Sequence, residues 1–202
     1  MWAWRVENGL QYEFSVAEFS GSNQERQVLE DMLLWQHRLE YGESTLCNHG
    51  RFHPCYSWPS NRKQGRKGQK LPLGQISLAS GPSLPALQLQ GQPQDQTWME
   101  LAWSRVIPFD KVIAKEVPVG DGLYKILDGN TGTLLYIGES HQLAKRLKTH
   151  SRKNWEPYLP VMSYHSLPEG TLPHQRREWE VDLIGAYYAA FKQPPVFQYR
   201  NH

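Results

Sequence analysis

The chain has 202 residues and a mass of 23.4 kDa, enough for one good hydrophobic core and too little for a large multidomain enzyme. Aromatic residues make up 12% of it, which favours a folded globular protein and argues against disorder over the whole chain. The formal charge is only +2, so the overall balance does not by itself indicate a polyanionic partner.

The sequence contains no pattern typical of a membrane span or a signal peptide. No run of eighteen apolar residues occurs, and the N-terminus lacks a charged leader followed by an apolar block. We therefore expect no membrane span, no signal peptide and a cytoplasmic location.

The first forty residues contain a strand pattern and then a helix pattern. Residues 2–6 and 10–16 both alternate apolar and polar positions, and Asn8-Gly9 stands between them, which predicts an antiparallel hairpin. Ser22 stands three residues before Glu25, as in a capping box, and apolar residues then recur at helical spacing up to Leu39. This predicts an amphipathic helix of about five turns.

Residues 44–94 contain no Asp or Glu and carry six positive charges, so these 51 residues sum to +6 and the other 151 to −4. The stretch from about residue 60 to residue 95 is rich in Gly, Pro and Ser and is predicted to be a flexible basic loop. It is either a solvated surface segment or an arm that contacts phosphates. As DNA-binding candidates we take its basic residues, together with one later lysine: Arg62, Lys63, Arg66, Lys67, Lys70 and Lys145.

A possible zinc site precedes this loop. Cys47, His49, His53 and Cys55 lie within nine residues, but zinc sites normally need longer intervals to surround the ion tetrahedrally. A structural Zn²⁺ is thus an alternative, and packing or hydrogen-bonding roles are favoured. In a reducing compartment the two cysteines are expected to be thiols or metal ligands.

From Pro118 onward the pattern predicts the order β, β, α, β, α. Two strands at 123–127 and 134–137 flank a turn at 128–132, a short helix follows from Ser140, a third strand spans 161–166, and a helix spans 174–191. Alternation places Tyr124 and Ile126 on one face of the sheet and Leu123, Lys125 and Leu127 on the other.

Glu180 stands out in the last predicted helix. Leu183, Ile184 and Tyr187 place it on the apolar stripe, where an isolated carboxylate is costly unless a charge meets it. Arg176, one turn earlier, is one candidate partner, and a divalent cation such as Mg²⁺ or Mn²⁺ is the other.

The pattern of residues 118–200 resembles the GIY-YIG nuclease family. Gly122-Leu123-Tyr124 stands for the first half of the motif and Tyr136-Ile137-Gly138 for the second, with eleven residues between the two tyrosines. Arg146 and His150 match the family's catalytic arginine and a recurrent histidine. Glu180 before Leu183-Ile184 matches its metal-binding glutamate. Either Gln198 or Asn201, three residues later, replaces the family's asparagine. Taken without the resemblance, tyrosines in strands are more often packing residues, although Gly122 and Gly138 would let a ligand approach the backbone.

The resemblance implies an α+β fold and a chemistry. The expected GIY-YIG domain, residues 118–202, is a small antiparallel three-stranded sheet flanked by helices, and residues 1–117 form an accessory α+β region with the hairpin, the helix and the basic loop. Glu180 would hold one Mg²⁺ or Mn²⁺, Arg146 would clamp the scissile phosphate, and Tyr124 would be the general base, assisted by Tyr136 or His150.

The expected function is that of a metal-dependent endonuclease that cuts duplex DNA. Size and single-chain plan are similar to those of GIY-YIG type II restriction enzymes, and this resemblance implies a site-specific, restriction-like homodimer. The alternatives are a structure-specific, nicking or mobile-element nuclease, and a DNA-binding protein of the same fold without turnover.

Overall fold

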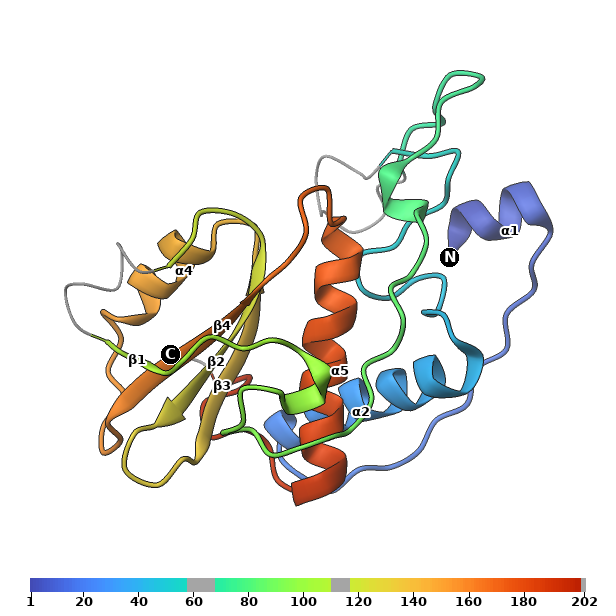
Figure 1. Ribbon diagram of the computed structural model, residues 1–202. Helices are drawn as coiled ribbons and strands as arrows, with labels where there is room; N and C mark the ends of the chain where they lie inside the picture. The colour runs from blue at the N-terminus through green and yellow to red at the C-terminus, as the bar shows by residue number, and fades with distance from the viewer. Residues whose placement is uncertain (58–67, 110–116, 201–202) are drawn as a thin grey trace.

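The computed structural model describes residues 1–57, 68–109 and 117–200. These residues form an α+β fold in which one antiparallel sheet lies between helices (Figure 1). The elements are α1 (Trp2–Asn8), α2 (Asn23–Tyr41), η1 (Leu78–Ser80), η2 (Trp98–Glu100), β1 (Ile107–Pro108), β2 (Gly122–Asp128), β3 (Leu134–Ser140), α4 (Leu143–His150), β4 (Pro160–Ser166) and α5 (Pro173–Phe191).

The N-terminal hairpin prediction is wrong. Residues 2–8 form the helix α1, and the adjoining Gly9 has φ 67° and caps the helix in the left-handed conformation. Asn-Gly therefore ends a helix here, a role that glycine serves as readily as a hairpin turn. The tertiary contacts of Trp2 with Tyr56 and of Trp4 with His53 explain the apolar positions.

The helix predicted from the capping box is confirmed. The Ser22 hydroxyl accepts from the backbone N–H of Glu25, and the Glu25 carboxylate accepts from the backbone N–H of Ser22, at the start of the 19-residue α2. Gly42, in the left-handed conformation, ends the helix.

The described sheet has four strands, not three, in the order β1-β4-β2-β3, all antiparallel. The additional strand β1 has only two residues and pairs with β4. The predicted order β, β, α, β, α is confirmed for β2 to α5, except that α4 begins at Leu143 and not at Ser140, which ends β3.

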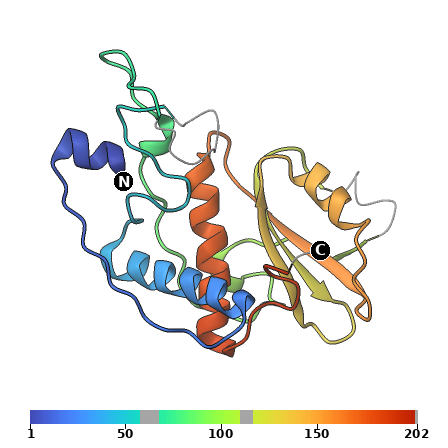
Figure 2. The ribbon, with the colours of Figure 1, turned by 180° about the vertical axis from the view of Figure 1, so that it is seen from behind.

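The two faces of the sheet carry separate cores, and α4 and α5 lie on opposite sides of it (Figures 1 and 2). Leu123 and Leu127 of β2 belong to the core that includes α5 residues, whereas Tyr124 and Ile126 belong to the core beneath α4. This alternation is as predicted. Lys125 shares the α5 side, where its Nζ lies 4.4 Å from the Trp103 ring centroid and donates to the Asp95 carbonyl.

Helix α5 is buried on more than one face, so the prediction of a single apolar stripe is wrong. It packs against both α2 and the sheet. Besides apolar residues it buries Glu178 and Asp182, whose side chains are 0% exposed. Trp179 and Phe191, expected on the stripe, are half-buried and exposed respectively.

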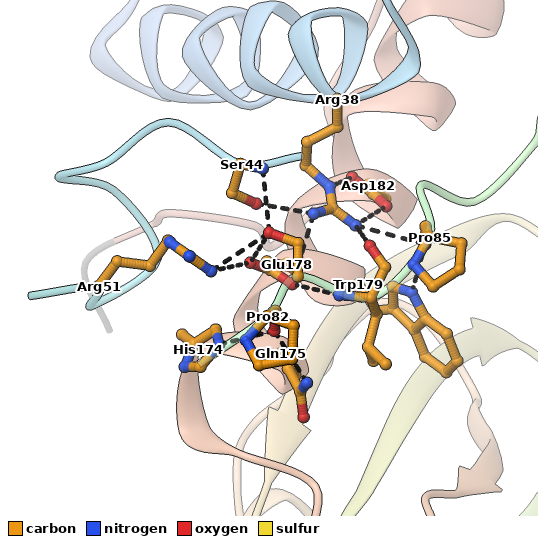
Figure 3. A network of polar contacts seen from close by, with 12 residues as sticks. Arg38, Ser44, Arg51, Pro82, Pro85, His174, Gln175, Glu178, Trp179 and Asp182 are labelled. Carbon is orange, nitrogen blue, oxygen red and sulfur yellow. Dashed lines mark hydrogen bonds and ion pairs between the residues drawn. The ribbon is translucent and has the colours of Figure 1, made fainter. Parts of the chain in front are cut away.

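Arg38 of α2 compensates the buried carboxylates of α5 (Figure 3). Its guanidinium donates to both oxygens of Asp182, at 2.8 and 3.1 Å, and lies 3.4 Å from Glu178. Arg51 also pairs with Glu178, at 3.1 Å. Buried charges are tolerated only with such partners, so this network fastens α2 and the residues after it to α5.

The part of the basic loop between residues 82 and 87 is anchored, which corrects the prediction of a loop that is flexible throughout. The backbone N–H of Leu84 donates to Glu178 and that of Leu87 donates to Asp182. Leu87 also belongs to the same core as α5 residues. The hydrophobic core therefore includes residues on both sides of position 117, the predicted domain boundary.

Candidate active site

Tyr124 and Tyr136 lie on neighbouring strands beneath α4. Their rings are stacked, with centroids 6.1 Å apart and an interplanar angle of 18°. Tyr124 pairs across the sheet with Gly138, and a Cβ on that glycine would overlap the phenol of Tyr124. The space at Gly138 is thus filled by Tyr124 itself, and that at Gly122 by Leu143 and the His165 carbonyl. The expectation that these glycines admit a ligand is wrong.

Helix α4 brings Arg146 and His150 to the same phenol. Leu143 and Leu147 are fully buried and fix the helix on the sheet. Arg146 and His150 are one helical turn apart. Arg146 Nε lies 3.1 Å from the Tyr124 Oη, and His150 Nε2 lies 2.9 Å from the same oxygen. The ring of His150 also lies 5.0 Å from that of Tyr136, centroid to centroid. The predicted tyrosine pair, arginine and histidine are therefore in one cluster.

The hydrogen-bond roles in this cluster follow from its chemistry. A guanidinium can only donate, so Tyr124 Oη accepts from Arg146. Burial, with a further contribution from Tyr136, raises the pKa of Tyr124 well above its ordinary value, while Arg146 opposes this shift. Tyr124 therefore keeps its proton at neutral pH and can donate it to Nε2 of His150.

Glu180 approaches this cluster from α5. Its Oε1 accepts from the backbone N–H of Glu139 at 3.2 Å, near the end of β3. It is close enough to Tyr136 for its charge to raise the pKa of that phenol, after the larger effect of burial. Because β3 is an edge strand of the sheet, groups from α4 and from α5 meet around it.

The side chain of Arg176 does not pair with Glu180, which corrects one of the two sequence interpretations. Its Nε donates to Glu139 at 2.9 Å and its Nη1 donates to Asp121 at 3.0 Å. Burial, reinforced by the charges of Glu139 and Asp31, raises the pKa of Glu180 to about 8. The carboxylate of Glu180 thus lies in a surrounding that is already negative.

Asp31 is a neighbour of Glu180 that the sequence reasoning missed. It is buried on α2, its carboxylate accepts from the Tyr199 hydroxyl at 2.6 Å, and burial raises its pKa to about 7. A signal was present, because Asp31 lies on the same helix face as Val28 and Trp35, three residues after one and four before the other. An acidic residue on an apolar face was the anomaly that identified Glu180.

An open pocket of about 370 Å³ borders the cluster. The helix α4 contributes Lys145, Arg146 and Thr149 to its wall. Lys145 and Arg146 are exposed, and the residues from Ser140 to Trp155 include no acid. Such a surface attracts anions, because the acidic residue of its wall, Glu139, is paired with Arg176 and does not neutralise Lys145 and Arg146. Its wall is formed by Glu139, Ser140, His141, Gln142, Lys145, Arg146 and Thr149.

Gln198 lies beside the site, on the outer edge of β3. It is 2% exposed, and its Oε1 accepts from the backbone N–H of Ile137 at 3.1 Å. Two residues further along the strand, the outward N–H of Glu139 is taken by Glu180. The side chains of Gln198 and Glu180 therefore satisfy successive donors of the edge strand.

Of the predicted DNA-binding residues of the first half, the structure describes Lys70 alone. Arg62, Lys63, Arg66 and Lys67 lie outside the described residues. Lys70 is described, and its ammonium pairs with both carboxylate oxygens of Glu7, at 2.8 and 2.9 Å. Its charge is thus already compensated within the chain.

The proposed zinc ligands lie in different surroundings. Cys47 and Cys55 are free and exposed. His53 contacts Asn8 through Nε2 and the backbone N–H of Cys55 through Nδ1. His49 is buried, and burial lowers its pKa to about 4. Among the described residues no group of three or more His, Cys, Asp or Glu side chains is arranged to hold a metal ion.

Glu180 has the character expected of a single ligand for Mg²⁺ or Mn²⁺. These ions are commonly bound through one or two carboxylates, with water and substrate phosphates completing the shell. Burial and the nearby carboxylates of Glu139 and Asp31 raise the pKa of Glu180, and a cation beside it would oppose these effects. The donor chemistry and charge therefore fit a divalent ion at this position.

No protein-family model, curated protein or solved structure matches this chain. In the part of the chain that the structure describes, no helix combines the length and the apolar character needed to cross a bilayer.

Proposed function

We propose that the chain is a metal-dependent endonuclease that hydrolyses phosphodiester bonds in duplex DNA. The observation that carries the proposal is the hydrogen-bonded group Arg146, Tyr124 and His150 beside the carboxylate of Glu180. It unites a cation for phosphate, a proton relay and a hard oxygen ligand at the edge of one basic pocket.

Arg146 and Lys145 would bind the substrate phosphate. Arg146 is exposed toward the pocket while its Nε is held by the phenol of Tyr124. The other donors of a guanidinium can then form charge-assisted hydrogen bonds with phosphate oxygens and stabilise the charge that develops in the transition state. Lys145 supplies a second positive charge in the same wall.

Tyr124 would take part in general-base catalysis through a relay. Its raised pKa rules out a standing phenolate at neutral pH. Its oxygen accepts from Arg146 and also hydrogen-bonds with Tyr136. Tyr136 would take the proton of an attacking water and pass its own proton to Tyr124, whose proton passes to His150 Nε2. The relay thus permits base catalysis by a group whose free pKa is near 10.

Glu180 would hold the divalent ion. When bound, that ion supplies Lewis-acid stabilisation of the leaving oxygen. The Glu139 N–H fixes one carboxylate oxygen of Glu180 toward β3, which orients the ligand relative to the tyrosines. The charges of Asp31 and Glu139 attract any cation to Glu180, and once the pH exceeds about 8 a metal ion no longer has to displace a proton there.

The direct test is incubation of supercoiled plasmid with the full chain and Mg²⁺ or Mn²⁺. We expect nicked or linear product with the wild type and none with Glu180→Gln, while Glu40→Gln, an exposed glutamate of α2, cleaves normally. Absence of cleavage by the wild type over a range of metals and duplex sequences would contradict the proposal.

Substrate preference needs a second comparison. Sequenced ends from digested genomic DNA would show a fixed motif if the enzyme is site-specific and restriction-like. Faster cutting of branched or single-stranded DNA than of duplex would favour the structure-specific alternative.

A further inference from the structure

Arg176 links three elements next to the metal position proposed at Glu180. Its guanidinium donates to Asp121 before β2, to Glu139 on β3 and to the backbone carbonyl of Thr171 before α5. The side chain is 9% exposed. An arginine this buried, with two carboxylate partners, is held in one orientation.

The Glu139 side chain starts very close to Glu180. The backbone N–H of Glu139 is the donor to Glu180 Oε1, at 3.2 Å. From this point the Glu139 carboxylate extends to Arg176, with Oε2 at 2.9 Å from Nε. Without that partner, rotation about the side-chain bonds of Glu139 would bring a second carboxylate toward the ion that Glu180 binds.

A second carboxylate at the ion would reduce the positions that are open to water and substrate. Mg²⁺ bound by one carboxylate keeps positions for water and phosphate oxygen, and a further protein ligand takes one of those positions. It would bind the ion more tightly and leave less room for the substrate.

We infer that Arg176 is a positioning residue that holds the Glu139 carboxylate away from the metal ion at Glu180. This inference rests on the proposed function. It makes a distinctive prediction, because loss of Arg176 should strengthen metal binding and at the same time slow cleavage. A residue with only a structural role would, when replaced, weaken both.

The experiment compares four variants of the full chain: Arg176→Gln, Glu139→Gln, the double variant, and Arg177→Gln. Arg177, the next residue of α5, contacts the His49 carbonyl and serves as the matched control. Binding of Mn²⁺ without DNA is measured from the electron paramagnetic resonance signal of the free ion. Plasmid cleavage is then measured as a function of Mg²⁺ concentration, and thermal melting checks that each variant is folded.

For Arg176→Gln we expect the Mn²⁺ midpoint to fall about fivefold, the effect of one uncompensated negative charge near a divalent ion. The cleavage rate at saturating Mg²⁺ should fall at least about tenfold, a loss typical when a metal's surroundings are disturbed. The double variant should return both quantities to within about threefold of the wild type. Arg177→Gln should change neither.

The single variant Glu139→Gln tests the same point without removing Arg176. If Arg176 holds Glu139 outside the metal shell, this change loses only a distant charge and weakens Mn²⁺ binding less than about fivefold. A loss of fiftyfold or more would show that Glu139 is already a ligand and would overturn the inference.

Weaker Mn²⁺ binding by Arg176→Gln, or a double variant as slow as Arg176→Gln, would also overturn it and leave Arg176 a structural residue. These results differ from failure of the proposed function, in which the wild type neither binds Mn²⁺ in a Glu180-dependent way nor cuts plasmid.

Discussion

Replacing Glu180 with Gln should stabilise the metal-free protein at alkaline pH. Burial and the neighbouring Glu139 and Asp31 raise the pKa of Glu180 from 4.5 to about 8. The folded state therefore binds the carboxyl proton of Glu180 more tightly than the unfolded state does. As a result, the free energy of unfolding falls as the pH rises from about 4.5 to about 8. Gln keeps the size and the acceptor for the Glu139 N–H but cannot ionise.

The size of the effect follows from the difference in pKa. At about 1.4 kcal/mol for each unit, the full shift sets an upper limit of about 5 kcal/mol. Glu180 keeps some contact with solvent, so water screens its charge. We therefore expect a gain of about 2 kcal/mol in the free energy of unfolding. For a chain of this length, that corresponds to an increase in melting temperature of about 4–8 °C.

The assay is thermal unfolding of wild type and Glu180→Gln in EDTA at pH 5 and pH 9. The two melting temperatures should agree at pH 5, where Glu180 is protonated, and the variant should be the more stable at pH 9. Adding Mg²⁺ at pH 9 should then stabilise the wild type and not the variant. A variant that is less stable at pH 9, or equally shifted at both pH values, would refute the view of Glu180 as an under-compensated carboxylate. Glu40→Gln, which is exposed on α2, controls for loss of a surface charge.

Three further changes test the surroundings of the site. Tyr124→Phe should leave the melting temperature within a few degrees and lower the plasmid cleavage rate by about 10²- to 10⁴-fold, because the relay loses its hydroxyl; a rate within threefold of the wild type would remove Tyr124 from the mechanism. Gly138→Ala should lower the free energy of unfolding, measured in urea, by about 1–3 kcal/mol, since the new methyl overlaps the phenol of Tyr124. An unchanged urea midpoint would show that the phenol has room to move. Arg38→Met should lower the free energy of unfolding by about 3–5 kcal/mol in the same assay, because the buried Asp182 carboxylate loses its arginine partner and Glu178 keeps Arg51 alone; a loss below about 1 kcal/mol would show that water reaches the two carboxylates.

The second half of the fold could be predicted because local signals agreed with one another. The alternation in β2, the turn after Asp128 and the proline at the start of α5 each indicated the element that the structure contains. The hairpin prediction failed at residues 2–8 because a segment of seven residues is too short to distinguish the alternation of a strand from the periodicity of a helix. The contacts that decide it, Trp2 with Tyr56 and Trp4 with His53, join positions about fifty residues apart.

Motif spacing singled out Tyr124, Arg146 and His150, which the structure places together, but it did not give the partners of the other candidate residues. Arg176 lies one turn from Glu180 on α5, and helical geometry alone favours their pairing. In the structure the sheet end offers Arg176 two carboxylates, Glu139 and Asp121, at hydrogen-bond distance. Partners from other elements are not visible in the spacing of a single helix. The position of Asp31 near Glu180 is likewise not visible, although its place on the apolar face of α2 is.

Helix α5 explains how the first half of the chain influences the candidate site. Glu178 and Asp182 bind α2 and residues 83–87. Arg176 and Glu180 alternate with them along the helix and bind the end of β3. A helix held by buried charges on both sides has little freedom to rotate, because a small rotation would break pairs on each side. The position of the Glu180 carboxylate relative to Tyr124 and Arg146 is therefore set by Arg38 as much as by the sheet. On this reasoning α2 and residues 83–87 contribute to the geometry of the candidate site.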